Sequence, residues 1–415
     1  MKTLDPRLLT DLAARHGTPL YVYDARVVRE RVASLRRFDA IRFAQKACSN
    51  VHVLRALRAQ GVLVDAVSHG EVVRALRAGF TGAGEPADLV YTADVVDRAT
   101  LALLVERDIP MNAGSPDMLE QLGRAHRGHR VWLRVNPGFG HGHSHKTNTG
   151  GASSKHGIWH EHLDVALKHV DEYELDLVGL HMHIGSGADF AHLRQVAGAM
   201  VRQVKALGRD LRAISCGGGL PIPYRPGDAP IDVDAYFDVW DAARREVEQV
   251  LGHAVALEIE PGRYLVAEAG KLVAEVLAVK SSGPNRFALV DAGFNDLVRP
   301  AMYGSFHAIS LVRAGAEVDG PLQPTVVGGP LCESGDVFTV EEGGVVAPRE
   351  LPETRVGDLV VFHDAGAYGA AMASNYNSKP LAPEVWVDDD GARLVRRRQT
   401  IDDLLALEEG LGAGD

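Results

Sequence analysis

Lys46 is the first residue whose position could support chemistry. It lies in the segment FAQKA, at the end of an apolar run that begins at Ile41. An amine at the end of a buried strand is costly unless its charge is used or its proton is lost. A desolvated lysine loses its proton more readily and becomes a nucleophile that can form a Schiff base. Lys46 alone is equally compatible with a surface lysine just beyond a strand, so its role depends on its neighbours.

Two later motifs could bind a phosphate and a positively charged ring. Cys216 is followed by three glycines, 217–219, whose backbone N–H groups can approach a phosphate closely. Arg263, in the segment EPGR, would add a cation beside the same phosphate. Glu260, in the same segment, ends an apolar run, where a bare carboxylate needs a cationic partner such as a protonated pyridine nitrogen. A tight turn and a structural Glu260–Arg263 ion pair explain the same residues without a ligand.

Two histidine clusters raise the alternative of a metal site. His181 and His183 alternate in HMHIGSG, so that only one of them is expected to face the site together with Ser186. The second cluster, within residues 141–145, reads HGHSH. Neither cluster has the helical HExxH spacing or a close set of carboxylates, so we expect no metal.

The elements that must position these residues form a repeated pattern. Eight short apolar or β-branched runs alternate with stretches of helical period, several of which end in glycine. The runs are 41–47, 63–68, 89–94, 109–115, 130–137, 177–185, 213–219 and 256–262. Eight such units predict an α/β fold with a (βα)8 barrel, and nearly every run ends in a polar or glycine-rich cluster, where barrel active sites are built. A doubly wound open sheet is the alternative.

The pattern changes after residue 270 to alternating strands without long helices. We expect strands in 271–282, 286–294, 324–329, 336–344, 358–368 and 384–398, the last with an Asp-Gly hairpin turn. They predict an antiparallel β-sandwich or barrel-like C-terminal domain that also takes the N-terminal strand PLYVYD. The predicted domains are a segment, 1–35, that joins the β domain, a barrel over 36–268 that binds the cofactor, and the β domain over 269–415. A short acidic helix, TIDDLLALEEG, ends the sequence.

Composition argues against several classes of protein. The 415 residues are 46% hydrophobic and 24% charged, with a formal net charge of -11, which suits a two-domain globular enzyme. Basic residues are scattered apart from Arg396–Arg398, so we expect no nucleic-acid partner. Three widely spaced cysteines favour a reducing compartment over disulfides. Neither a signal segment nor an apolar run long enough for a membrane span is present, so we expect a cytoplasmic enzyme without a membrane partner.

The order of the motifs resembles a known family. FAQKA, Asp65-x-x-Ser68, HxHIGS, GGG, EPGR, CESGD and GAYG follow one another as in the fold-type III pyridoxal-phosphate decarboxylases, which include ornithine, arginine and diaminopimelate decarboxylases. The resemblance extends from near Thr18 to the C-terminus. Longer stretches, among them RFAQKACSN, KTNTGG, SKHGIW and DAGFNDLVRPAMYG, are similar to the enterobacterial type of meso-diaminopimelate decarboxylase.

The resemblance implies roles for the cofactor-binding residues. Lys46 would hold pyridoxal 5'-phosphate as a Schiff base, His183 would stack on its ring, and Glu260 would bind the pyridine nitrogen, which keeps the ring an electron sink. The residues expected to bind the cofactor are Lys46, Asp65, His183, Ser186, Gly218, Gly219, Glu260, Gly262, Arg263 and Tyr368. Cys332, in CESGD, resembles the cysteine that reaches the partner subunit's site and handles the proton that replaces the carboxylate. Lys46 and Cys332 would then be the catalytic residues of a homodimer.

The resemblance also indicates a small amino-acid substrate. Arg299 and Tyr303 would grip a carboxylate at the end that does not react, and Glu333, beside Cys332 at the partner's site, would bind an ammonium there. The expected substrate-binding residues are Arg263, Arg299, Tyr303, Glu333 and Tyr368. A second carboxylate calls for a bidentate arginine, whereas ornithine would call for an acid in its place. The expected reaction is decarboxylation of meso-2,6-diaminopimelate to L-lysine, the last step of lysine biosynthesis.

Several alternatives remain open on the sequence. A related decarboxylase could act on another amino acid, such as a D-amino acid or a precursor of a specialised metabolite. A barrel racemase could also use Lys46. A non-catalytic cofactor-binding module predicts the loss of Lys46 or Cys332, and both are present. One departure from the family is His69, where a small or apolar residue is usual; it would either tune reactivity or be a loop residue.

Overall fold

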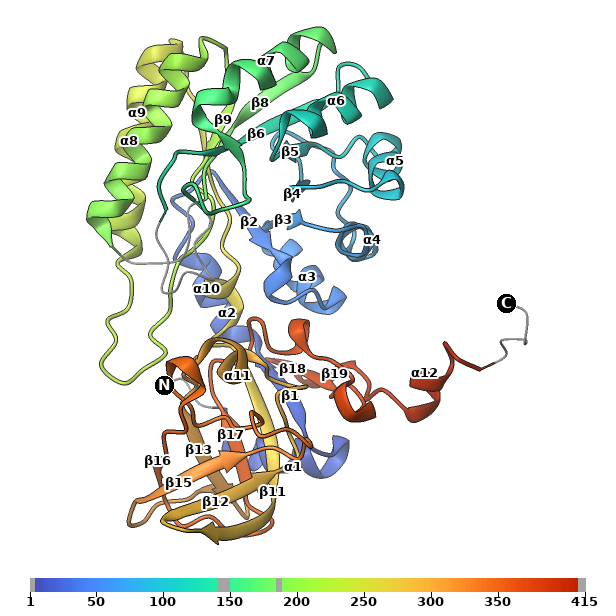
Figure 1. Cartoon of the computed structure of the whole chain (residues 1–415), viewed down its shortest axis with the longest axis vertical. Coiled ribbons are helices and arrows are strands. Elements are labelled where there is room, and N and C mark those ends of the chain that lie inside the picture. Colours follow the sequence, from blue (N-terminus) through green and yellow to red (C-terminus); the bar gives the residue numbers. More distant parts are fainter. Residues whose placement is uncertain (1–3, 141–149, 184–188, 410–415) are drawn as a thin grey trace. The chain divides into compact units, whose positions relative to one another are not determined.

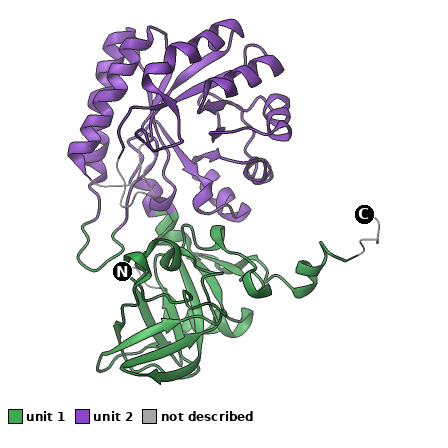
Figure 2. Ribbon diagram, viewed as in Figure 1, with its two compact units in different colours: residues 1–29, 223–229, 266–415 green, residues 30–222, 230–265 purple. Residues whose placement is uncertain are grey.

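The computed structural model describes residues 4–140, 150–183 and 189–409. They form two compact units, shown in different colours in Figure 2. The barrel unit comprises 30–222 and 230–265, and the β unit comprises 1–29, 223–229 and 266–415. The short segment 223–229 therefore belongs to the β unit although barrel elements precede and follow it in the sequence.

In the described part of the barrel unit, eight parallel strands close into a ring (Figure 1). Around the ring they are β2 (Ala40–Ala44), β3 (Leu63–Ala66), β4 (Leu89–Ala93), β5 (Met111–Ala113), β6 (Arg130–Asn136), β8 (Asp176–His181), β9 (Ala213–Ser215) and β10 (Ala256–Ile259). Each lies within, or one residue outside, a predicted run, so the predicted barrel is confirmed and the open sheet is wrong. A further short strand, β7 (Ile158–Trp159), pairs with β6.

Helices connect successive strands of the ring. They are α3 (Val51–Arg58), α4 (His69–Ala78), α5 (Arg98–Glu106), α6 (Pro116–Ala125), α7 (Leu163–Glu172), α8 (Phe190–Leu207) and α9 (Val233–Leu251), with the short helices η1 (Gln45–Ala47) and η3 (His160–His162). A further short helix, α10 (Arg263–Val266), follows the last ring strand, β10. Side chains such as Ser68 and Asp232 accept hydrogen bonds from the first turns, and glycines such as Gly79 and Gly252 end helices in the left-handed conformation. Among the described helices, none combines the length and the apolarity that a membrane span requires.

The β unit is built on a mostly antiparallel, ten-stranded sheet, counted over its described residues. Its strands are β1 (Leu20–Asp24), β11 (Gly270–Ser282), β12 (Asn285–Val290), β13 (Ile309–Arg313), β14 (Ala316–Glu317), β15 (Gln323–Gly328), β16 (Arg349–Leu351), β17 (Leu359–Phe362), β18 (Glu384–Asp388) and β19 (Gly391–Arg396). The N-terminal strand β1 pairs antiparallel with β11 and parallel with β18. The prediction that this strand joins the C-terminal sheet is confirmed.

Two features of the β unit differ from the prediction. The segment 336–344 forms no strand; it makes isolated bridges at Val337 and Val340 and ends in the short helix η4 (Glu342–Gly344). The strands β13, β14 and β16 were not predicted. The remaining helices are α1 (Pro6–His16), α2 (Ala25–Ala33), which follows β1 in the chain, α11 (Arg299–Tyr303), η5 (Ala370–Met372), η6 (Tyr376–Ser378) and α12 (Ile401–Leu405), the last within the predicted C-terminal helix.

A buried ion pair lies across the seam at which the ring closes. β10 pairs with β2, and Arg42 on β2 donates from Nε and Nη2 to Glu258 Oε2 on β10 over 3.1 and 2.9 Å. Both side chains are at most 2% exposed. Arg42 also donates to the Ala87 carbonyl over 2.8 Å. Burial raises the pKa of Glu258, and Arg42 opposes this rise, so the carboxylate depends on its partner to remain charged.

Replacing Arg42 by Met is expected to destabilise the barrel by about 3–5 kcal/mol, because it leaves Glu258 buried without its cation. The double variant R42M/E258L should recover most of this loss, since neither charge remains. Urea denaturation followed by circular dichroism measures both. The control is Arg209→Ala, which breaks an ion pair with Asp171 whose side chains are 46% and 54% exposed. A loss in R42M no larger than in R209A would contradict the expectation.

Candidate active site

Lys46 lies in η1, directly after β2, at the end of the barrel where the strands finish. Its side chain is exposed, although Gln45 and Ala47 on either side are buried. The charge of Lys46 acts on both Asp65 and His183, opposing the rise that burial causes in the pKa of Asp65 and adding to the fall that burial causes in the pKa of His183. The structure therefore brings Lys46 near two predicted cofactor residues, at an exposed position just beyond the strand.

Glu260 lies directly after β10 and is held by two neighbouring strands. His181 Nε2 lies 2.7 Å from Glu260 Oε2, and the Ser215 hydroxyl donates to Oε1 over 3.0 Å. His181 ends β8 and Ser215 ends β9. The Glu260 side chain is 10% exposed. Burial alone would raise its pKa, but the charge and hydrogen bond of His181 lower the pKa of Glu260 to about 2, so the carboxylate is ionised at neutral pH.

The glycine turn after β9 packs against His183 and Glu260. The Gly218 N–H donates to His183 Nδ1 over 3.2 Å. A Cβ at Gly218 would lie 2.3 Å from the Glu260 carbonyl oxygen, and one at Gly217 would lie 2.6 Å from His183 Cβ. Gly217 and Gly219 also have positive φ angles of 62° and 97°. The turn therefore has room for backbone alone.

His183 is a neutral imidazole at this site. Its Nδ1 accepts a hydrogen bond, so the ring proton is on Nε2. Burial lowers the pKa of His183 well below its usual value, and the charges of Lys46 and Arg134 lower it further. The charge of Glu260 acts on His183 as well as on His181. Both histidines therefore interact with Glu260, contrary to the expected alternation, because β8 ends at His181.

Asp65, on β3, is a second carboxylate near Glu260 and is 2% exposed. Burial raises the pKa of Asp65 well above its usual range, and the charge of Glu260 adds to the rise, whereas Lys46 and a hydrogen bond to Thr92 lower it. Asn112 Nδ2 donates to Thr92 Oγ1 over 3.3 Å, which extends the network to β5. The two nearby carboxylates therefore have pKa values shifted in opposite directions, that of Asp65 upwards and that of Glu260 downwards.

The segment after Glu260 packs closely on the end of β2. The Ala44 N–H donates to the Pro261 carbonyl over 3.2 Å. A Cβ at Gly262 would lie 3.1 Å from the Ala44 carbonyl oxygen and 3.2 Å from Ala47 Cβ. Gly262 therefore lets this segment approach the turn that carries Lys46. Arg263 follows as the first residue of α10 and is half-buried.

The site also contains Thr92 and Ser215, which were not predicted, together with Arg134 and with His181, one of the two histidines that the sequence offers for it. Arg134, on β6, is 7% exposed. Burial lowers the pKa of Arg134, while the charges of Asp94, Glu260 and Asp65 raise it, so it is a cation among carboxylates. Each of the four is a polar residue within an apolar strand. That signal could have been used, since a buried polar side chain needs partners.

The other predicted site residues belong to the β unit. Arg299 begins α11 and is 5% exposed, and Tyr303 ends it and is 36% exposed. Cys332 and Glu333 are both exposed. Tyr368 is half-buried and has a φ of 58°.

Three predicted features need separate mention. Ser186 and the histidine cluster within 141–145 lie outside the described residues. In the parts of the chain that are described, no group of three or more His, Cys, Asp and Glu side chains is arranged to hold a metal. His69 is exposed in the first turn of α4.

The barrel residues fit pyridoxal phosphate. An ionised Glu260 suits a protonated pyridine nitrogen, and a neutral His183 offers an uncharged ring. The glycine turn leaves backbone without side chains, as a phosphate site needs. Asp65 Oδ1 and Arg134 Nε are buried without a hydrogen-bond partner among the described residues, as expected of groups that border a polar ligand.

Comparisons with known proteins agree with this chemistry. The family model for the pyridoxal-binding domain of pyridoxal-dependent decarboxylases matches residues 25–267. The diaminopimelate decarboxylase of Escherichia coli (strain K12) is 60% identical over 402 residues, which are 96% of each chain. This chain belongs to the diaminopimelate decarboxylase family. The family expected from the sequence is confirmed.

Two solved diaminopimelate decarboxylases share the fold. One crystal structure has a TM-score of 0.95 at 59% identity and covers 97% of this chain and 96% of its own. The enzyme of Helicobacter pylori, complexed with L-lysine, has a TM-score of 0.85 at 30% identity and covers 97% of this chain and 100% of its own.

Replacing Gly218 by Ala is expected to weaken pyridoxal phosphate binding by roughly tenfold or more, because the added Cβ would displace the turn. Titration of cofactor-free protein with pyridoxal phosphate, followed by absorbance, measures the affinity. Gly70→Ala is the matched control, since a Cβ at Gly70 would meet no atom within 4 Å. Equal affinities in the two variants would show that the turn does not contact the cofactor.

Proposed function

We propose that this chain decarboxylates meso-2,6-diaminopimelate to L-lysine and carbon dioxide, the last step of lysine biosynthesis. The observation that carries the proposal is the ionised, nearly buried Glu260 carboxylate, in a charge network with Asp65 and Lys46. When bound, pyridoxal phosphate supplies an electron-accepting ring that takes up the electrons left when carbon dioxide departs. Membership of the diaminopimelate decarboxylase family selects this substrate over another amino acid.

Different barrel residues would bind different parts of the cofactor. Lys46 would hold it through its amine, and Glu260 would keep the pyridine nitrogen protonated, because the low pKa of Glu260 leaves it charged at neutral pH. His183 would lie against the ring, and Asp65 would lie near Lys46. The remaining groups would take the phosphate: the backbone of Gly218 and Gly219, with Ser186, Gly262, Arg263 and Tyr368.

A proton must replace the lost carboxylate on the same carbon. We assign its delivery to Cys332, whose thiol is free and exposed and can therefore reach a substrate outside its own unit. In a homodimer, the partner subunit's Cys332 and the partner subunit's Glu333 would complete each site. Each active site would then need Lys46 of one subunit and the partner subunit's Cys332.

The end of the substrate that does not react carries a carboxylate and an ammonium. Arg299 can donate two parallel hydrogen bonds to a carboxylate, and Tyr303 adds a hydroxyl beside it on α11. Arg263 and Tyr368 would contact the reacting part, and Glu333 the ammonium. The complex of the Helicobacter pylori relative with L-lysine supports this assignment, because lysine has such an end.

We also propose a cytoplasmic location. Cys48, Cys216 and Cys332 form no disulfide with one another, as is usual in a reducing compartment.

Purified protein loaded with pyridoxal phosphate is expected to release carbon dioxide from meso-2,6-diaminopimelate, and not from lysine, ornithine or arginine. Lys46→Ala should abolish both this activity and the absorbance band at about 420 nm that marks attachment of the cofactor to an amine. Lys205→Ala, at an exposed position of α8, is the control and should change neither. Absence of carbon dioxide would refute the proposal, and loss of chirality without it would indicate a racemase.

Mixing the inactive variants K46A and C332A should restore activity if each site combines two subunits. Random exchange gives one intact site in half of the dimers, so recovery should approach about a quarter of the wild-type value. Decarboxylation of the mixture is measured after incubation, with each variant alone as the control. No recovery, despite subunit exchange detected by a tag on one variant, would place Lys46 and Cys332 in a site of one subunit.

A further inference from the structure

Arg299 contacts two side chains of the β unit, those of His307 and Tyr224. Its Nη1 lies 3.0 Å from His307 Nε2, and its guanidinium carbon lies 4.7 Å from the centre of the Tyr224 ring. The Arg299 residue is only 5% exposed. A cation at such a position needs contacts that fix its direction as well as its charge.

His307 is fixed as an acceptor towards Arg299. Its Nδ1 lies 2.8 Å from the carbonyl oxygen of His363, and His307 is 3% exposed. A carbonyl oxygen can only accept, so Nδ1 carries the ring proton. Nε2 is then unprotonated and accepts the Arg299 N–H. The tautomer of His307 is therefore set from the far side of its ring.

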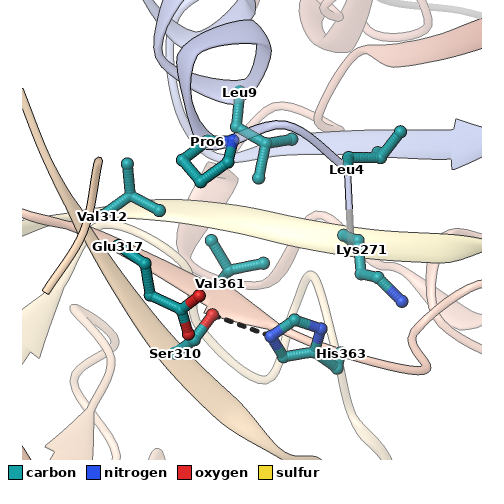
Figure 3. Close-up of a pocket in the computed structure, with 9 residues that line it drawn as sticks. All are labelled: Leu4, Pro6, Leu9, Lys271, Ser310, Val312, Glu317, Val361 and His363. Carbon is teal, nitrogen blue, oxygen red and sulfur yellow. Dashed lines mark hydrogen bonds between the residues drawn. The ribbon is translucent and has the colours of Figure 1, made fainter. Parts of the chain in front are cut away.

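The carbonyl that sets this tautomer is itself firmly held. His363 follows β17, and its backbone N–H donates to the Ala308 carbonyl over 2.9 Å. Its side chain Nε2 lies 2.8 Å from Ser310 Oγ on β13, as Figure 3 shows. Burial lowers the pKa of His363 to about 3, so this imidazole stays neutral and the contact with Ser310 persists across the physiological pH range.

Tyr224 covers both Arg299 and His307. Its ring centre is 5.6 Å from that of His307, at an interplanar angle of 76°. The next residue, Arg225, lies 4.9 Å from the centre of the Phe306 ring. These contacts explain why 223–229 groups with the β unit, and they place a rigid aromatic ring against the guanidinium.

We propose that His307, together with Tyr224, is a positioning residue that makes the protein select substrates with a second carboxylate. The inference rests on the proposed function, in which Arg299 binds that carboxylate. A neutral imidazole directs one N–H of Arg299 without neutralising its charge, whereas an acidic partner in its place would compete with the substrate. A guanidinium has five N–H donors, and a bidentate contact with a carboxylate uses two of them.

The test compares two ligands of the cofactor-loaded protein. L-Lysine keeps the carboxylate that is not lost, and 1,5-diaminopentane has the same carbon chain and amines without it. His307→Leu is expected to weaken lysine binding by roughly tenfold to a hundredfold and to leave diaminopentane binding nearly unchanged. His307→Gln, whose amide oxygen can accept from Arg299, should restore much of the preference. Isothermal titration calorimetry measures each affinity without turnover.

Kinetic measurements and variants of Tyr224 extend the test, so that it does not depend on a single variant of His307. For diaminopimelate, H307L should raise KM more than it lowers kcat. If H307L fails to fold, Tyr224→Leu should lower the preference for lysine, and Tyr224→Phe, which keeps the ring, should preserve it. His253→Leu, at an exposed histidine of the barrel unit, is the control.

Equal weakening of both ligands in H307L, or no change in either, would overturn the inference. A wild-type protein that releases no carbon dioxide from diaminopimelate would instead overturn the proposed function. The two failures are distinct, since only the first compares variants of a protein whose activity has been established.

Discussion

The pairing of β10 with β2 closes the barrel, and the position of the site depends on this closure. Lys46 follows β2 and Glu260 follows β10, so the pairing of these two strands places residues far apart in the sequence at neighbouring strand ends. Arg42 and Glu258 bind each other across the same seam, and Gly262 lets the segment after β10 pack on the end of β2. The pairing of β10 with β2 therefore brings the parts of the site together.

Much of the barrel could be predicted from the sequence because parallel strands buried on both faces appear as continuous apolar runs. Glu260 and the glycine turn were found because a carboxylate and three glycines at strand ends are unusual. The exposure of Lys46 was one of two possibilities that the sequence left open, since it depends on η1, a single turn that carries no periodic signal. The prediction of a strand over 336–344 was wrong because alternating residues alone do not guarantee a pairing partner.

His307 and Tyr224 show a second limit of sequence reasoning. Tyr224 lies in a loop between barrel elements, and no pattern in the sequence assigns residues 223–229 to the β unit. His307 appears as one histidine among many, because its tautomer is set by the backbone carbonyl of His363. Contacts that depend on the backbone of distant residues leave no trace in residue type. Only coordinates reveal them.

Glu260 and Arg299 need different kinds of support from their neighbours. Burial alone would raise the pKa of Glu260, but the charge and hydrogen bond of His181, with the hydrogen bond of Ser215, lower it and keep the carboxylate ionised. Arg299 is charged at any physiological pH and needs direction rather than charge, which His307 supplies as a neutral acceptor. One histidine, His181, is thus the hydrogen-bond partner of the carboxylate, and another, His307, is a fixed acceptor for the guanidinium. The two roles differ because Glu260 needs help to remain ionised in a nearly buried position, whereas Arg299 is always charged and needs only a fixed direction.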